Sequence, residues 1–222
     1  MEGKVVNRWL IGFDVRVDPA QYAGRRWDAT RRAHYLLRPE VERPLSVDGL
    51  AWPSVFCLKG LDQLSDSPIE IDPDVVGGDP WRDLDLLRAC YDAHRELAPD
   101  GVFIAVELLS EKEAEAQTLP YALPDGIEAA VSLEPTNPDR LPEGSTLLGY
   151  DIADAGWISG LVNTEYAEQD IRALAPRWAA RLNSFGLVDR LDDAVAFREV
   201  CDARMPGQGP FWIYALWRLP LE

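Results

Sequence analysis

Histidine and cysteine are scarce in this chain of 222 residues, which has 2 His and 3 Cys. The cysteines, Cys57, Cys90 and Cys201, are far apart and form no C-x-x-C pair, so a disulfide framework or zinc knuckle has no support and we expect reduced thiols. A catalytic triad would need His34 or His94, and neither has a recognisable nucleophile nearby. Cys90 and His94 are one helical turn apart, but a metal site needs three or four ligands. We therefore predict no metal and no cofactor.

The chain also lacks the patterns of several catalytic and membrane classes. It contains no phosphate-binding glycine loop, no Gly-x-Ser-x-Gly elbow and no His-Glu-x-x-His motif. No apolar run approaches the roughly 18 residues of a membrane-spanning helix, and the N-terminus has no long apolar signal segment. These patterns predict a cytoplasmic protein that does not act on membranes. Whether it is an enzyme stays open, and a non-enzymatic role is favoured.

Acidic residues are abundant and unevenly distributed. The formal net charge is −16, and 47% of the residues are hydrophobic, as in a folded globular protein. Residues 46–142 hold 6 basic and 20 acidic groups, a net charge of −14, whereas residues 1–45 hold 9 and 6, a net charge of +3. Such a field attracts a basic protein and repels nucleic acid, although acidity also serves solubility. We expect a protein partner with a basic surface and no nucleic acid.

The best candidate contact for that partner is the acidic segment 62–79, which contains two prolines, two glycines and little helical period. Its candidate partner-binding residues are Asp62, Asp66, Glu70, Asp72 and Asp74. The regular Asp spacing and closing Glu of a calcium loop are absent. A protein contact is therefore favoured over a calcium site.

Apolar runs and helix signals alternate irregularly along the chain, which is typical of α+β proteins. We predict strands at 9–17, 54–58, 102–109 and 211–219, helices at about 19–37, 80–97 and 189–205, and a helical region at 164–186 interrupted at Pro176. The expected fold is a mixed, largely antiparallel sheet packed by several helices. We expect a single domain over residues 1–222, with a proline-rich excursion at about 110–146.

The first of these strands alternates between apolar and charged residues. Phe13, Val15 and Val17 fall on one face, and Asp14 and Arg16 fall on the other. The pattern predicts a strand whose charged face meets solvent.

The predicted helix at 19–37 carries the chain's basic, aromatic-interleaved patch. Its members are Arg25, Arg26, Arg31, Arg32 and Arg38 beside Trp27, His34 and Tyr35. Nucleic-acid binding is one interpretation. A solvated, ion-paired face is favoured, because Asp28 lies at helical spacing from two of the arginines and the rest of the chain is acidic.

A β-hairpin is predicted within Leu147–Asn163, with strands at 147–152 and 157–162. The hairpin contains Asp151, Asp154 and Ser159. Together with Asp14, the two aspartates are an alternative polar cluster at strand ends, where carboxylates can hold a metal or act as acid and base. The favoured interpretation is structural, because Asp in turns caps backbone amides.

One hexapeptide is echoed in the chain. Leu10–Val15 and Leu147–Ile152 match in kind at six positions, each with Gly third and Asp fifth. The residues that follow do not match, which favours coincidence over duplication. A true duplication would place the two strands at equivalent positions in the sheet.

The sequence from Gly149 to Asp154, followed by Ser159-Gly160-Leu161 and Asn163, resembles a stretch of uncharacterised bacterial proteins, some of which act as immunity partners of secreted toxins. The resemblance implies an immunity protein that neutralises a basic toxin. It covers under a tenth of the chain and transfers no functional residues. The alternative is a metal- or carboxylate-dependent enzyme that uses Asp14, Asp151 and Asp154.

Overall fold

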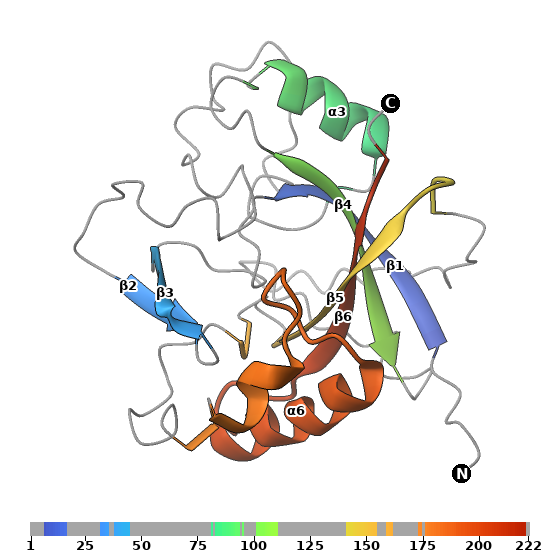
Figure 1. Ribbon diagram of the computed structural model, residues 1–222. Coiled ribbons are helices and arrows are strands. Elements are labelled where there is room, and N and C mark those ends of the chain that lie inside the picture. Colours follow the sequence, from blue (N-terminus) through green and yellow to red (C-terminus); the bar gives the residue numbers. More distant parts are fainter. Residues whose placement is uncertain are drawn as a thin grey trace.

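A four-stranded antiparallel sheet is the centre of the computed structural model (Figure 1). Its order is β1-β4-β6-β5, and its strands are β1 (Asn7–Arg16), β4 (Val102–Ser110), β5 (Thr146–Ala153) and β6 (Trp212–Arg218). The structure describes residues 7–16, 32–35, 38–44, 81, 83–93, 95, 101–110, 141–154, 159–161, 173–174 and 176–220. The strands predicted at 9–17, 102–109 and 211–219 are confirmed as β1, β4 and β6.

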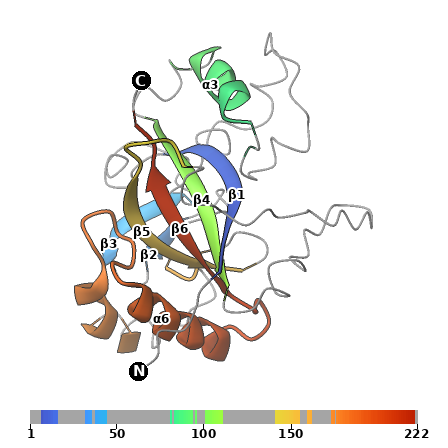
Figure 2. The ribbon, with the colours of Figure 1, turned by 90° about the vertical axis from the view of Figure 1, so that its right-hand side faces the viewer.

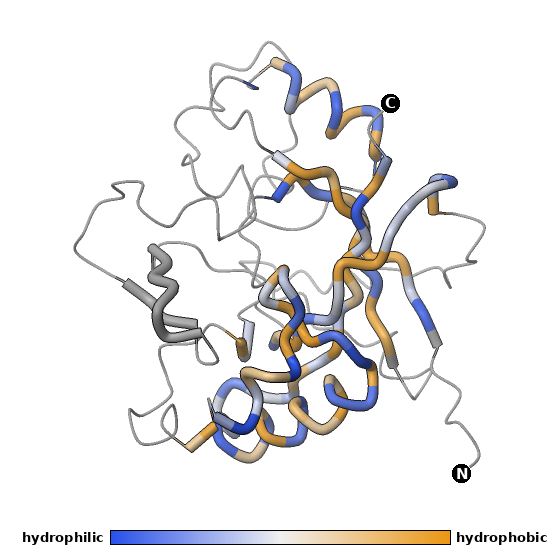
Figure 3. Tube along the Cα trace, in the orientation of Figure 1, coloured by the Kyte–Doolittle hydropathy of each residue, from blue (hydrophilic) through white to orange (hydrophobic). Residues whose placement is uncertain are grey.

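The two central strands are apolar on both faces, which explains their position. Ile104 to Leu109 in β4 and Trp212 to Leu216 in β6 are buried, with one charged residue, Glu107, among them. Hydrophobic residues accordingly concentrate along these strands (Figure 3). A strand with neighbours on both sides and cover on both faces must consist largely of side chains that tolerate loss of water.

Helices α3 (Leu84–Ala93) and α6 (Leu191–Arg204) lie at opposite ends of the sheet in both views (Figures 1 and 2). The Asp83 carboxylate accepts hydrogen bonds from the backbone N–H groups of Asp85 and Leu86 at 2.9 and 3.0 Å, and so caps the start of α3. α3 packs against β1, and α6 packs against β5 and β6. Both confirm the helices predicted at about 80–97 and 189–205, with shorter bounds.

The buried stripe of α6 consists of Ala194, Phe197 and Cys201, spaced by three and four residues as a helix requires. Phe197 meets the ring of Trp178 edge to face at 4.9 Å. Trp178 directly precedes η4 (Ala179–Arg181), a 3-10 turn within the region where we predicted interrupted helix. Positions 173–174 and 176–178 are also helical.

The echoed hexapeptides form the two edge strands of the sheet. β1 skips one residue between Leu10 and Gly12 in its pairing, and β5 skips one between Leu147 and Gly149. The residue after each glycine then forms an antiparallel bridge to a segment outside the sheet: Phe13 to Trp81, and Tyr150 to Val188. The elements β1, α3 and β4 thus correspond to β5, α6 and β6, and we call these two sets the halves of the fold. In each half a helix starts three residues after that bridge and is followed by a central strand.

An approximate twofold axis relates the two halves. Gly12 pairs with Val106, and Gly149 pairs with Leu216, so Val106 and Leu216 are equivalent positions. These two residues pair directly with each other between β4 and β6. The two halves correspond in their strand pairing, in their bulges, in their bridges and in where their helices start. This correspondence favours duplication over the coincidence that the sequence favoured.

The N-terminal region differs from the sequence prediction. β2 (Arg32–Tyr35) pairs with β3 (Arg38–Pro44) in a separate antiparallel ribbon, so the C-terminal part of the helix predicted at 19–37 is wrong. Cross-strand pairing overrides local helix preference here. The strand predicted at 54–58, most of the proline-rich excursion and the acidic segment lie outside the described residues. Where the structure describes the chain, it is α+β and every strand pairing is antiparallel.

Candidate functional site

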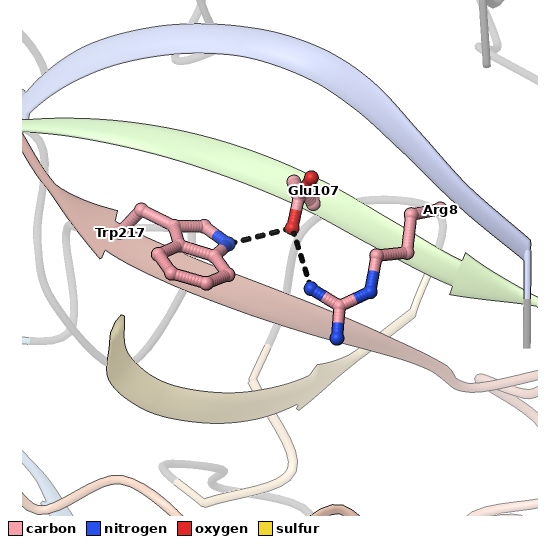
Figure 4. A network of polar contacts seen from close by, with 3 residues as sticks. All are labelled: Arg8, Glu107 and Trp217. Atoms are coloured by element: carbon pink, nitrogen blue, oxygen red, sulfur yellow. Dashed lines mark hydrogen bonds and ion pairs between the residues drawn. The ribbon is translucent and has the colours of Figure 1, made fainter. Parts of the chain in front are cut away.

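Glu107 is a carboxylate inside the sheet. It lies in the middle of β4 with 1% of its surface exposed. Its Oε2 accepts a hydrogen bond from the indole Nε1–H of Trp217 at 2.6 Å and lies 3.5 Å from Nη1 of Arg8 (Figure 4). A buried carboxylate is costly unless donors surround it. The indole and the guanidinium therefore offset the loss of water.

Strand register brings these three side chains onto one face of the sheet. Leu10 of β1 and Ala215 of β6 pair with Glu107 from either side. Arg8 lies two residues before Leu10, and Trp217 lies two residues after Ala215, so both point to the same face as Glu107. Glu107 and Trp217 are also equivalent positions of the two halves, because their partners Leu10 and Leu147 are equivalent.

A pocket of about 250 Å³ opens above this network. Its lining comprises Arg8, Glu107, Trp217 and the turn formed by residues 141–145. Ser145 closes that turn, since its backbone N–H and hydroxyl donate to the Pro142 carbonyl at 3.1 and 2.7 Å. Glu143 is exposed at the turn. The pocket thus combines two carboxylates, one guanidinium and an aromatic ring, a lining suited to a cationic group.

Tyr150 lies within electrostatic range of the same network. Burial raises the pKa of its phenol most strongly, Arg8 lowers this pKa, and Glu107 and Asp189 raise it. The phenol therefore stays protonated and neutral at physiological pH.

Asp14 and Arg16 form a buried ion pair on β1. Arg16 Nε lies 2.8 Å from Asp14 Oδ2, and both side chains are 1% exposed. The other carboxylate oxygen of Asp14 accepts the backbone N–H of Val15 at 2.7 Å. The prediction that this face of the strand meets solvent is wrong, because mutual neutralisation lets both charges be buried.

Asp151 lies in the equivalent position on β5 and has the equivalent backbone bond. Its Oδ1 accepts the backbone N–H of Ile152 at 2.8 Å and the hydroxyl of Ser159 at 2.6 Å. Ser159 in turn accepts the backbone N–H of Leu161 at 3.1 Å, and Ala153 bridges to Ser159 as a hairpin requires. Asp154 is buried just after the strand. The strand predicted at 147–152 is thus confirmed as β5. Of the described part of the strand predicted at 157–162, Ser159 pairs with Ala153, but Gly160 and Leu161 form a turn, so the prediction is wrong there. Residues 155–158 lie outside the described part of the chain.

The sheet keeps Asp14 away from Asp151 and Asp154. Asp14 pairs with Ile104 of β4. Asp151 pairs with Tyr214 of β6, and Tyr214 pairs with Leu108 of β4. Three strand spacings and four residues along the strand separate Asp14 from Asp151, roughly 20 Å. Within the described residues no group of three His, Cys, Asp or Glu side chains is placed to hold a metal.

The two cysteines that the structure describes, Cys90 and Cys201, are buried thiols that form no disulfide. Burial raises the pKa of the Cys90 thiol to about 11. A thiol in this environment is protonated and poorly nucleophilic at neutral pH. His94 and Cys57 lie outside the described residues.

The predicted partner-binding residues, Asp62, Asp66, Glu70, Asp72 and Asp74, all lie outside the described part of the chain. Glu107, by contrast, is a site residue that sequence reasoning missed. Its signal was one carboxylate inside the otherwise apolar run 102–109. A charge at a position whose neighbours are all buried needs a partner or a function.

Comparison of the chain with models of protein families, with curated proteins and with solved structures gives no match. Among the described residues, no helix is long and apolar enough to cross a membrane.

Proposed function

We propose that this protein binds a basic protein partner and neutralises it, in the manner of an immunity protein that inhibits a toxin. One observation carries the proposal: residues 46–142 have a net charge of −14 within a chain of −16. A surface field of this sign speeds the approach of a basic partner and repels acidic competitors. The acidic segment 62–79 is the proposed centre of contact.

The described surface includes two strongly exposed carboxylates. The Asp85 and Asp192 side chains are 93% exposed, and their ion-pair partners Arg88 and Arg190 lie at 3.5 and 4.0 Å. Exposed pairs of this geometry add little stability. These carboxylates are therefore available to a partner at small cost.

A cytoplasmic location is part of the proposal. Cys90 and Cys201 form no disulfide, which suits a reducing compartment. A protein that protects its own cell from a toxin would act there.

The carboxylate enzyme is the less favoured alternative. It needs Asp14, Asp151 and Asp154 in one site, and the sheet places Asp14 roughly 20 Å from Asp151. Asp14 and Asp151 also each accept a backbone N–H, as structural aspartates do.

Co-expression tests the proposal. The product of the neighbouring gene is expressed in a host cell with this protein, without it, or with a variant in which Asp62, Asp66, Glu70, Asp72 and Asp74 become Asn or Gln. We expect growth with the native protein and arrest without it, and weaker protection by the variant. A harmless neighbour that forms no complex with this protein would overturn the proposal.

A further inference from the structure

We infer that the pocket at Glu107 and Trp217 receives an arginine side chain of the basic partner, and that Arg8 is the internal occupant which this side chain displaces. This inference rests on the proposed function and names the chemistry by which one residue of the partner is anchored. The acidic segment supplies long-range attraction in that scheme, and the pocket supplies a specific contact.

The carboxylate of Glu107 is a built acceptor for a cation. It is 1% exposed, faces the pocket and is oriented by the 2.6 Å bond from the Trp217 indole (Figure 4). Both of its contacts use Oε2, and within the described residues Oε1 accepts no hydrogen bond. A guanidinium presents paired N–H donors that match both oxygens of a carboxylate.

Arg8 is held weakly in comparison with Arg16 on the same strand. Arg16 is 2.8 Å from its carboxylate and 1% exposed, whereas Arg8 is 3.5 Å from Glu107 and 40% exposed. The Arg8 guanidinium carbon lies 6.0 Å from the Trp217 ring centroid, at the outer limit of a cation–π contact. In the unbound protein Arg8 therefore neutralises Glu107 through weak contacts, which the guanidinium of an incoming arginine can replace.

The size and walls of the pocket suit one long side chain. Its volume of about 250 Å³ lies below the roughly 300–1,000 Å³ of sites for drug-sized ligands. Leu141, Pro142 and the Trp217 ring give the stem of an arginine apolar contact, and Glu143 adds a second carboxylate at the turn. A planar guanidinium stacks on an indole better than a compact ammonium does, so arginine is preferred to lysine.

A free probe tests the pocket without the partner. N-acetyl-arginine amide is titrated into the ¹⁵N-labelled full chain, and the indole N–H signals of the 8 tryptophans are followed by NMR, with Trp217→Phe identifying the signal of Trp217. We expect the Trp217 signal to shift most. Arg8→Ala should strengthen binding, and Glu107→Gln should weaken it about tenfold, since charge-assisted bonds are about twice as strong as neutral ones. Matched controls are Arg190→Ala and Glu199→Gln, on or next to α6, which should change nothing.

Two results would overturn the inference: a Trp217 signal that the probe leaves unmoved in both the native chain and Arg8→Ala, or equal shifts with N-acetyl-glycine amide. If Glu107→Gln does not fold, the Arg8→Ala comparison decides alone.

The partner complex then separates this inference from the proposed function. If Glu107→Gln lowers the affinity for the basic partner and Glu199→Gln does not, the result supports the binding of a partner arginine at Glu107. If Glu107→Gln binds the basic partner with unchanged affinity, the inference about the pocket is refuted and the proposed function is unaffected. If the probe binds but the co-expression test finds no basic partner, the proposed function is refuted and the pocket is assigned to a small free cation instead.

Discussion

Gly149 is the residue of β5 where a single methyl group should be most damaging. Its φ is +147°, and an added Cβ would lie 2.8 Å from the Leu187 side chain and 3.0 Å from the Val188 carbonyl oxygen. The backbone conformation costs a non-glycine residue about 1–3 kcal/mol, and forced overpacking costs about 1–3 kcal/mol more. Gly149→Ala should therefore lose roughly 2–6 kcal/mol of unfolding free energy.

Two other glycines separate the cost of the backbone conformation from the cost of overpacking. Gly144 has a φ of +89° but open space, with the nearest atom 3.8 Å from an added Cβ, and Gly207 has no atom within 4 Å and no positive φ. Gly144→Ala should show the backbone term alone, about 1–2 kcal/mol, and Gly207→Ala should be neutral or stabilise by about 0.4–1 kcal/mol.

Thermal and urea unfolding, followed by tryptophan fluorescence and far-ultraviolet circular dichroism, measure the three variants. A protein of this size loses about 2–4 °C of Tm per kcal/mol, so Gly149→Ala should melt lowest, by about 4–24 °C relative to the native chain. Equal melting of Gly149→Ala and Gly144→Ala would refute the close approach of β5 to the 187–188 segment.

Three further predictions concern buried polar groups. Arg16→Met should cost about 3–5 kcal/mol because it removes a cation that pairs with the buried Asp14 carboxylate, and adding Asp14→Leu should recover part of this loss; simple additivity in a double-mutant cycle would contradict the pair. Ser159→Ala should cost about 1–3 kcal/mol by removing the hydroxyl bonded to Asp151, and urea midpoints identical to the native value would argue against that bond. The pKa of Cys90 rises from 9.0 to about 11 on folding, so the unfolded chain loses this proton first and stability should fall between pH 9 and 11; a Cys90→Ala variant with the same decline would exclude the thiol as its cause.

The central strands and the two helices could be predicted because each follows from a local pattern. β4 and β6 are apolar runs too short for buried helices, and α6 combines acidic residues in its first turn with a helical stripe. The Arg32–Pro44 ribbon could not be predicted in this way, since its stability comes from pairing between strands, which depends on packing context.

The site residues depended on information that a single sequence holds poorly. The alternation of apolar and charged residues along β1 predicted that Asp14 and Arg16 face solvent. That pattern shows that both residues are charged, but it does not show that they neutralise each other. The separation of Asp14 from Asp151 follows from strand order, which placed two similar hexapeptides at opposite edges of the sheet. Glu107 was visible as one charge in an apolar run, but its partners Arg8 and Trp217 are about a hundred residues away in sequence.

The central claim is that negative charge brings a basic protein to this chain, and the association rate constant at several salt concentrations tests it most directly. The protein partner identified by co-expression is mixed with the native protein by stopped flow at about 0.01 to 1 M salt, a range over which the screening length falls from about 30 to 3 Å. We predict an association rate constant that falls at least about tenfold across this range while dissociation changes little. A rate constant independent of salt, or no association at the lowest salt, would contradict the account.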